Sequence, residues 1–152
     1  DPGVRYPLDP RDAHDPLPGA RRIEQRTLLL FDCTFPEGKR ILLHRRPEKG
    51  VLRGMWEFPA LEGKLSQDEA LRQALRMVEP YGLFVRKIAP LRDAKHIFTH
   101  IEWQMSAWLL SATADSLPET QAALPEDFSL VQRLADITLP SAFKSYRTVF
   151  GE

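Results

Sequence analysis

Six basic residues gather within one short stretch of the chain, between positions 39 and 53. They are Lys39, Arg40, Arg45, Arg46, Lys49 and Arg53. Because lysine and arginine side chains neutralise phosphate charge, a cluster of this size on a hairpin and its adjoining loop could bind several phosphates of a nucleic-acid backbone. The same side chains could instead form a solvated face opposite the apolar residues at positions 41–43. The residue types alone leave both interpretations open.

Two histidines, His96 and His100, lie four positions apart in the segment HIFTH. On a helix this spacing can hold zinc, but the surrounding pattern predicts a strand and a turn, and no third ligand stands at a fixed offset. We therefore predict no metal site here. The histidines could form a polar tip used in recognition, or a structural pair. Phe98, between them, could stack on a nucleic-acid base or pack into the core.

No combination of residues in the chain suggests a catalytic centre. The carboxylates that could pair for acid–base chemistry are scattered, and no two share a helix face in an apolar setting. They are Glu57, Glu62, Asp68, Glu69 and Glu79. The glycine spacing matches neither a P-loop nor a dinucleotide-binding loop, and there is no nucleophile elbow. The single cysteine, Cys33, follows an apolar run and is interpreted as a small residue near a strand end. The residues thus predict a recognition surface and no catalytic group.

The composition is that of an ordinary globular domain. The chain has 152 residues, 43% hydrophobic and 28% charged, which is enough apolar material for one core. Its 21 basic and 21 acidic residues cancel, so it lacks the strongly basic character of an autonomous nucleic-acid-binding protein. No apolar run approaches the ~18 residues that span a bilayer, so we expect no membrane partner. One cysteine excludes an internal disulfide and an iron–sulfur cluster, and is typical of a reducing, cytosolic compartment.

Residues 1–20 differ from the rest of the chain. They contain five prolines, at positions 2, 7, 10, 16 and 18, and no apolar period. Because proline at every third or fourth position prevents a helix or a central strand, we interpret this stretch as a linker or extended arm. A folded domain that follows such a leader suggests the C-terminal piece of a longer protein.

From position 21 onward the pattern predicts strands and two helices. Strands are expected at residues 24–33, 40–46, 55–61, 83–89, 95–99, 101–110 and 128–132, with an acidic loop at 113–127. Ser66 and Glu69 form a capping-box signature that begins a helix at 66–79, and a second helix is expected at 141–150. The strict alternation that starts at Ile101 indicates a half-buried antiparallel strand with Trp103 and Met105 on its apolar side. The sum is an α+β fold, a mixed β sheet with helices packed on it.

Three motifs resemble one enzyme family. Residues 44–59, HRRPEKGVLRGMWEFP, are similar to the RRPxxGLLxGLWEFP segment of MutY-type adenine DNA glycosylases, where it opens a C-terminal Nudix-like domain. Residues 96–100 (HIFTH) resemble the family's HxF[S/T]H loop, and residues 139–146 (LPSAFKSY) its LPxAFKKY ending. The motifs occur in the family's order. The resemblance implies a Nudix-like lesion-recognition domain at residues 21–152, with residues 1–20 at the position of the interdomain connector.

The resemblance also implies a function. The family enzyme removes adenine mispaired with 8-oxoguanine, and its N-terminal domain carries the catalytic acid and a [4Fe–4S] cluster. Neither is expected in this chain, which therefore should have no cofactor and no glycosylase activity alone. The implied lesion-binding residues are Phe98, Thr99 and His100, with Thr99 in place of the family's serine. The implied partners are duplex DNA containing 8-oxoguanine opposite adenine, and the catalytic domain of the same protein, in a bacterial, nucleoid-associated cytoplasmic setting. On this reading Arg45, Arg46, Lys49 and Arg53 are candidates for DNA-backbone contacts.

The Nudix resemblance predicts no hydrolase chemistry. A working Nudix box, G-x5-E-x7-R-E-U-x-E-E-x-G-U, uses its glutamates to bind magnesium. Here the Arg-Glu pair is replaced by Leu75 and Arg76, the Glu-Glu pair by Glu79 and Pro80, and the spacing from Gly63 is two residues short. One glutamate cannot supply the several oxygens that magnesium requires. The alternatives that remain are a stand-alone Nudix-fold nucleotide hydrolase and a nucleotide-binding regulatory module.

Overall fold

The computed structural model describes residues 20–152, so the predicted linker at 1–20 lies outside the described residues except for Ala20. A seven-stranded sheet has the order β3-β2-β1-β6-β5, with β4 paired to β1 and β7 paired to β2. Its strands are β1 (Arg22–Phe35), β2 (Gly38–Arg45), β3 (Trp56–Glu57), β4 (Ala60–Glu62), β5 (Phe84–Ile97), β6 (Ile101–Thr113) and β7 (Phe128–Val131). β1 and β6 are parallel and the other pairs antiparallel. The sheet is therefore mixed, as predicted.

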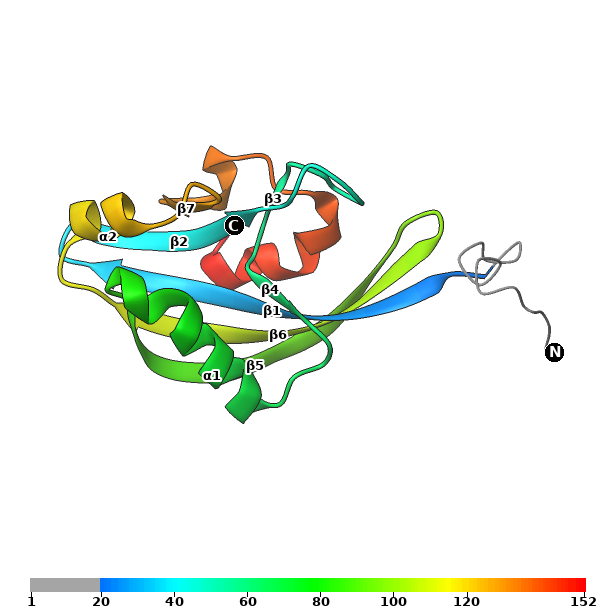
Figure 1. Ribbon diagram of the computed structural model, residues 1–152, viewed down its shortest axis with the longest axis horizontal. Coiled ribbons are helices and arrows are strands. Elements are labelled where there is room, and N and C mark those ends of the chain that lie inside the picture. Colours follow the sequence, from blue (N-terminus) through cyan, green and yellow to red (C-terminus); the bar gives the residue numbers. More distant parts are fainter. Residues whose placement is uncertain (1–19) are drawn as a thin grey trace.

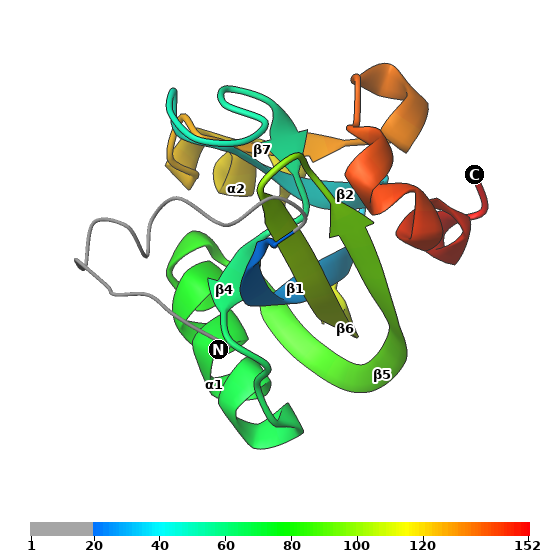
Figure 2. The same ribbon diagram turned by 90° about the vertical axis from the view of Figure 1, so that its right-hand side faces the viewer.

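Helical segments cover both faces of the sheet (Figures 1 and 2). They are α1 (Gln67–Val78), η2 (Glu79–Tyr81), α2 (Leu117–Ala123), η3 (Leu134–Asp136) and η4 (Ser141–Phe150). Leu29 and Phe31 of β1 pack on the α1 side, while Leu28 and Leu30 pack on the η4 side. A strand covered on both faces has no polar alternation, which explains the continuous apolar run in β1.

Several predicted elements are confirmed. β1 and β2 form the expected hairpin, and α1 begins where the capping box placed it, with the Ser66 hydroxyl accepting a hydrogen bond from the Glu69 N–H. Trp103 and Met105 are buried on one side of β6, as the alternation predicted. The C-terminal helix occupies its predicted residues but is a 3₁₀ helix. In the part of the chain that the structure describes, no helix is long and apolar enough to cross a membrane.

Other predictions were wrong in detail. The two strands expected at 83–89 and 95–99 are one strand, β5, whose register shifts between Val85 and Lys87 and again between Leu91 and Ala94. Such bulges break the alternation on which the prediction depended. The segment at 55–61 is divided between β3 and β4, and the acidic loop contains the short helix α2.

The hairpin of β5 and β6 carries the predicted recognition residues. Figure 1 shows it reaching past the helices, beside the start of β1, and Figure 2 views this end of the molecule. Because β6 pairs with β1 on one side and β5 on the other, the projecting part is a three-stranded ribbon. The fold thus places residues 98–100 at the end of a sheet.

Candidate functional site

The turn between β5 and β6 holds Phe98, Thr99 and His100 together. The Phe98 N–H donates to the Ile101 carbonyl at 2.7 Å, which closes the turn. The His100 carbonyl accepts a hydrogen bond from the Arg22 N–H at 2.9 Å, which ties the turn to β1. Thr99 and His100 are exposed, so their side chains can contact a ligand. We call residues 98–100 the hairpin tip.

Phe98 differs from the other two residues of the hairpin tip because its ring faces the protein. The ring is half-buried and packs edge-on against Trp103, with centroids 5.0 Å apart, and against His96, with centroids 4.7 Å apart. Trp103 is fully buried. Phe98 therefore anchors the tip to the core, which is the alternative that its residue type had left open beside base stacking.

The basic residues lie on the loop between β2 and β3, at positions 46–55. This loop has a fixed shape, because the Gly54 N–H donates to the Pro47 carbonyl at 3.0 Å and an added Cβ at Gly54, where φ is +69°, would lie 2.6 Å from the Glu48 carboxylate. Lys49 and Arg53 on the loop, and Arg45 beside it, are exposed. They remain candidates for phosphate contacts.

Arg46 differs from the other basic candidates. Its side chain is only 11% exposed, and it donates to Glu57 Oε1 at 3.0 Å and to the Val51 carbonyl at 3.0 Å. Its guanidinium lies 5.0 Å from the ring centroid of Trp103. These contacts give Arg46 a structural environment, in contrast to the solvated environment of Arg45, Lys49 and Arg53.

A buried ionic cluster around Glu57 was not identified from the sequence. Glu57 is 3% exposed, and its carboxylate bonds Arg26, Arg46 and His44. We call these four residues the Glu57 cluster. Its members are separated by up to 31 positions in the chain, so no local spacing indicated it. The one available signal was a glutamate between two aromatic residues in a short strand.

His44 links the Glu57 cluster to the segment that precedes β7. Its Nδ1 lies 2.9 Å from Glu57 Oε2 and its Nε2 lies 3.0 Å from Asp127 Oδ2. The hydrogen bond with Glu57, opposed by partial burial and supported by Asp127, raises the pKa of His44 above its ordinary value. The protonated ring can donate to both carboxylates, so the contact is strongest when His44 is charged.

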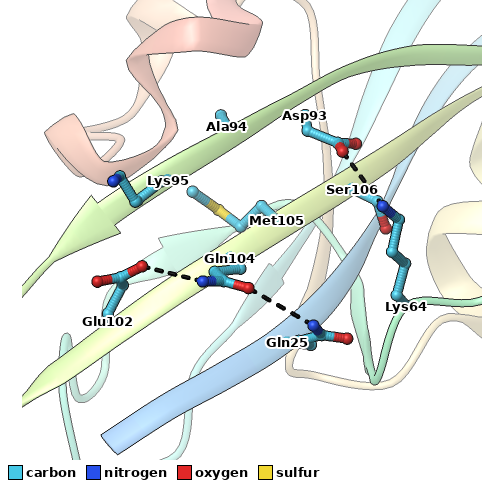
Figure 3. A pocket seen from close by; sticks show the side chains of 9 residues that line it. All are labelled: Gln25, Lys64, Asp93, Ala94, Lys95, Glu102, Gln104, Met105 and Ser106. Carbon is cyan, nitrogen blue, oxygen red and sulfur yellow. Dashed lines mark hydrogen bonds and ion pairs between the residues drawn. The ribbon is translucent and has the colours of Figure 1, made fainter. Parts of the chain in front are cut away.

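A pocket of about 480 Å³ lies on the opposite face of the same ribbon (Figure 3). Gln25, Gln104 and Glu102 form a row across β1 and β6, joined by hydrogen bonds of 3.5 and 3.0 Å. Two lysines and two carboxylates complete its charged lining, Lys64, Lys95, Asp93 and Glu102. Because these charges cancel, the pocket suits neutral hydrogen-bonding groups better than phosphate. The sequence analysis did not identify it.

The helix that would carry a Nudix metal site does not supply the ligands. Glu69 bonds Arg72 and Gln73 on an exposed face, and Glu79 is exposed at the end of α1. Within residues 20–152, no group of three or more histidine, cysteine or acidic side chains is arranged to hold a metal ion. The residues present therefore do not fit magnesium. Burial raises the pKa of the Cys33 thiol to about 12, so it is not a reactive nucleophile.

Comparisons with known proteins agree with this architecture. Part of the chain is 29% identical to mouse adenine DNA glycosylase over 87 residues, which are 56% of this chain and 16% of that protein. The chain thus spans about a sixth of the length of that relative. The solved C-terminal domain of mouse MUTYH, in complex with human PCNA, is 20% identical with a TM-score of 0.57, over 80% of this chain and 83% of that one. MutT protein from Methanosarcina mazei is 17% identical with a TM-score of 0.54, over 86% and 94%.

These structural similarities confirm the Nudix-like fold. A family model described as NUDIX domain matches residues 33–148, which include most of the sheet and the helices on both of its faces. The chain belongs to the NUDIX domain family.

Proposed function

We propose that this domain recognises 8-oxoguanine opposite adenine in duplex DNA, as the C-terminal part of a MutY-type adenine DNA glycosylase. The hairpin tip is the observation that carries the proposal, because it presents Thr99 and His100 to solvent on a projecting ribbon. The sequence similarity to mouse adenine DNA glycosylase supports the same assignment. The proposed partners are this DNA and a catalytic domain elsewhere in the protein, which would carry the [4Fe–4S] cluster.

The tip has the chemistry that lesion recognition requires. 8-Oxoguanine differs from guanine by one oxygen and one N7 proton. A hydroxyl such as that of Thr99 can donate to the first or accept from the second, and the His100 ring offers a further donor or acceptor. Discrimination arises because an unmatched polar group costs ~1–3 kcal/mol when it is desolvated without a partner. A turn already closed by the Phe98 hydrogen bond loses little conformational freedom on binding.

The exposed basic residues fit a supporting role. Arg45, Lys49 and Arg53 can contact phosphates, which positions DNA without distinguishing its bases. The formal net charge of the chain is +0, so most of the phosphate affinity would come from the catalytic domain. This division gives the present domain specificity rather than general affinity.

Nucleotide hydrolysis is the competing function, since MutT protein shares the fold. A hydrolase of this family needs magnesium to activate water, and the carboxylates of α1 do not fit the ion. Fold alone does not assign function, because one fold serves many different sites. The proposal therefore assigns this chain a binding role and no catalytic residue.

Binding of the chain to two duplexes tests the proposal. The duplexes differ only in 8-oxoguanine or guanine opposite adenine, and the ratio of their dissociation constants measures discrimination. Thr99→Ala should reduce this ratio by the equivalent of ~1–2 kcal/mol, while Thr99→Ser, which keeps the hydroxyl, should restore it. Thr138→Ala, at another exposed threonine, is the matched control. If wild type binds both duplexes equally, or Thr99→Ala weakens both alike, the assignment is wrong.

A further inference from the structure

The hairpin tip is packed on a single buried side chain. The rings of Phe98 and Trp103 meet edge to face, at an angle of 74°. Trp103 is fully buried, and its Nε1–H donates to Glu24 Oε1 at 3.1 Å. Because Phe98 directly precedes Thr99, a displacement of Trp103 would shift the Phe98 ring and with it the Thr99 hydroxyl. The position of the recognition group therefore depends on what holds Trp103.

Two arginine side chains lie over the Trp103 ring. The guanidinium carbon of Arg26 is 4.4 Å from the ring centroid and that of Arg46 is 5.0 Å from it. Each contact is attractive, because the face of an indole ring is electronegative. The two cations nevertheless repel each other. Burial lowers the pKa of Arg26, Glu57 opposes this shift, and the charge of Arg46 adds to it. The arrangement thus needs a negative charge between the two arginines.

Glu57 supplies that charge. Its Oε1 accepts hydrogen bonds from Arg26 at 3.3 Å and from Arg46 at 3.0 Å, while its Oε2 bonds His44 at 2.9 Å. Without the carboxylate, two adjacent cations would remain largely buried and uncompensated, which is strongly unfavourable. The guanidinium groups would then be expected to move toward solvent and away from the ring of Trp103.

We propose that Glu57 is a positioning residue for lesion discrimination: it holds Arg26 and Arg46 against Trp103 and thereby fixes Phe98 and the hairpin tip. This inference rests on the proposed function. The same carboxylate orients the loop between β2 and β3, because Arg46, which it binds, also donates to the Val51 carbonyl at 3.0 Å. One buried charge thus positions both the tip and the loop that carries the exposed basic residues.

The test measures discrimination and stability together. The full chain and its variants are titrated with the two duplexes, at a temperature where circular dichroism shows each variant to be folded. Glu57→Gln has nearly the same shape without the charge, and should lower the ratio of dissociation constants by about five- to thirty-fold, the range expected for Thr99→Ala. Glu57→Asp keeps the charge and should recover part of the ratio. Glu79→Gln, at an exposed glutamate at the end of α1, should leave the ratio unchanged.

A double variant shows whether Glu57 acts through the hairpin tip. Two substitutions that impair the same contact are not additive. Glu57→Gln combined with Thr99→Ala should therefore lose no more discrimination than the more impaired single variant. Fully additive losses would mean that Glu57 acts elsewhere, and would overturn the inference.

The outcomes separate the inference from the proposed function. If wild type discriminates and Glu57→Gln lowers the melting temperature without changing the ratio, Glu57 is merely structural; the inference fails while the proposed function stands. If wild type does not discriminate, both fail. Should Glu57→Gln not fold, Arg26→Lys is measured in its place, because it keeps the charge but loses the planar group over Trp103. An unchanged ratio in that variant also overturns the inference.

Discussion

The substitutions Trp103→Phe and Trp108→Phe make the same chemical change in one strand and should differ in cost. Both residues belong to β6, but they face opposite sides of the sheet. The Trp103 Nε1–H donates to Glu24, whereas the Trp108 Nε1–H is buried without a hydrogen-bond partner among residues 20–152. The comparison isolates what the polar and cationic neighbours of Trp103 contribute.

The expected difference follows from these contacts. Exchanging indole for phenyl removes a similar apolar volume at both positions, so that contribution largely cancels. A hydrogen bond to a charged group contributes about 1.5–3 kcal/mol, and the lower end applies because the Glu24 side chain is 37% exposed. Trp108→Phe instead removes an unpaired buried donor, which relieves a desolvation cost of the order of 1 kcal/mol. Trp103→Phe should therefore destabilise the domain by about 2 kcal/mol more than Trp108→Phe.

Urea unfolding followed by far-ultraviolet circular dichroism measures this difference without depending on tryptophan fluorescence. Trp103→Ala sets the upper limit, since truncating a fully buried aromatic residue costs about 3–5 kcal/mol. Equal destabilisation by the two phenylalanine variants would refute the reasoning. It would mean that the Glu24 bond and the guanidinium contacts add nothing to the stability of the Trp103 position.

Four further predictions concern charge and activity. The raised pKa of His44 means that its stabilising effect is complete below pH ~6.5 and is lost as the pH rises through its folded-state pKa, so His44→Gln should destabilise the domain more at pH 6 than at pH 8.5 in thermal unfolding. Lys49→Ala or Arg53→Ala should weaken binding to both duplexes alike and reduce the salt dependence by about one phosphate contact each, whereas Arg46→Ala should mainly lower the melting temperature. Calorimetry with millimolar magnesium should show no saturable site, and a stoichiometric isotherm would contradict our interpretation of α1. The purified chain should release no adenine from an adenine:8-oxoguanine duplex, provided that a full-length glycosylase is excluded as a contaminant.

Much of the fold was predictable because it depends on local patterns. The run at positions 28–31 required a strand covered on both faces, and Ser66 with Glu69 located the start of α1. The two bulges of β5 were not predictable, since they depend on its pairing with β6. The helix α2 was missed although Ser116 and Glu119 repeat the capping signature, because the acidic residues around it favoured a loop.

The candidate site was predictable only where it is exposed and contiguous. Thr99 and His100 belong to one turn, and a turn between two strands can be inferred from the sequence alone. Composition could not distinguish Arg46 from Arg45, because the difference is which side of β2 each faces and what lies there. Glu57 stands 31 positions from Arg26, and only the pairing of β4 with β1 and β3 with β2 explains why they meet.

The buried charges around Glu57 are better explained by position than by stability. Replacing a buried ionic group by apolar residues of similar volume is often neutral or stabilising, so such a group adds little to the stability of a domain of this size. Its geometry is restrictive, however: one carboxylate with three partners permits few arrangements of Arg26 and Arg46 above Trp103. A hairpin that distinguishes two bases by a single oxygen and proton needs a fixed origin more than it needs additional stability. The projecting tip has no helix against its end, and the stacked side chains beneath Phe98 supply that origin from within the sheet.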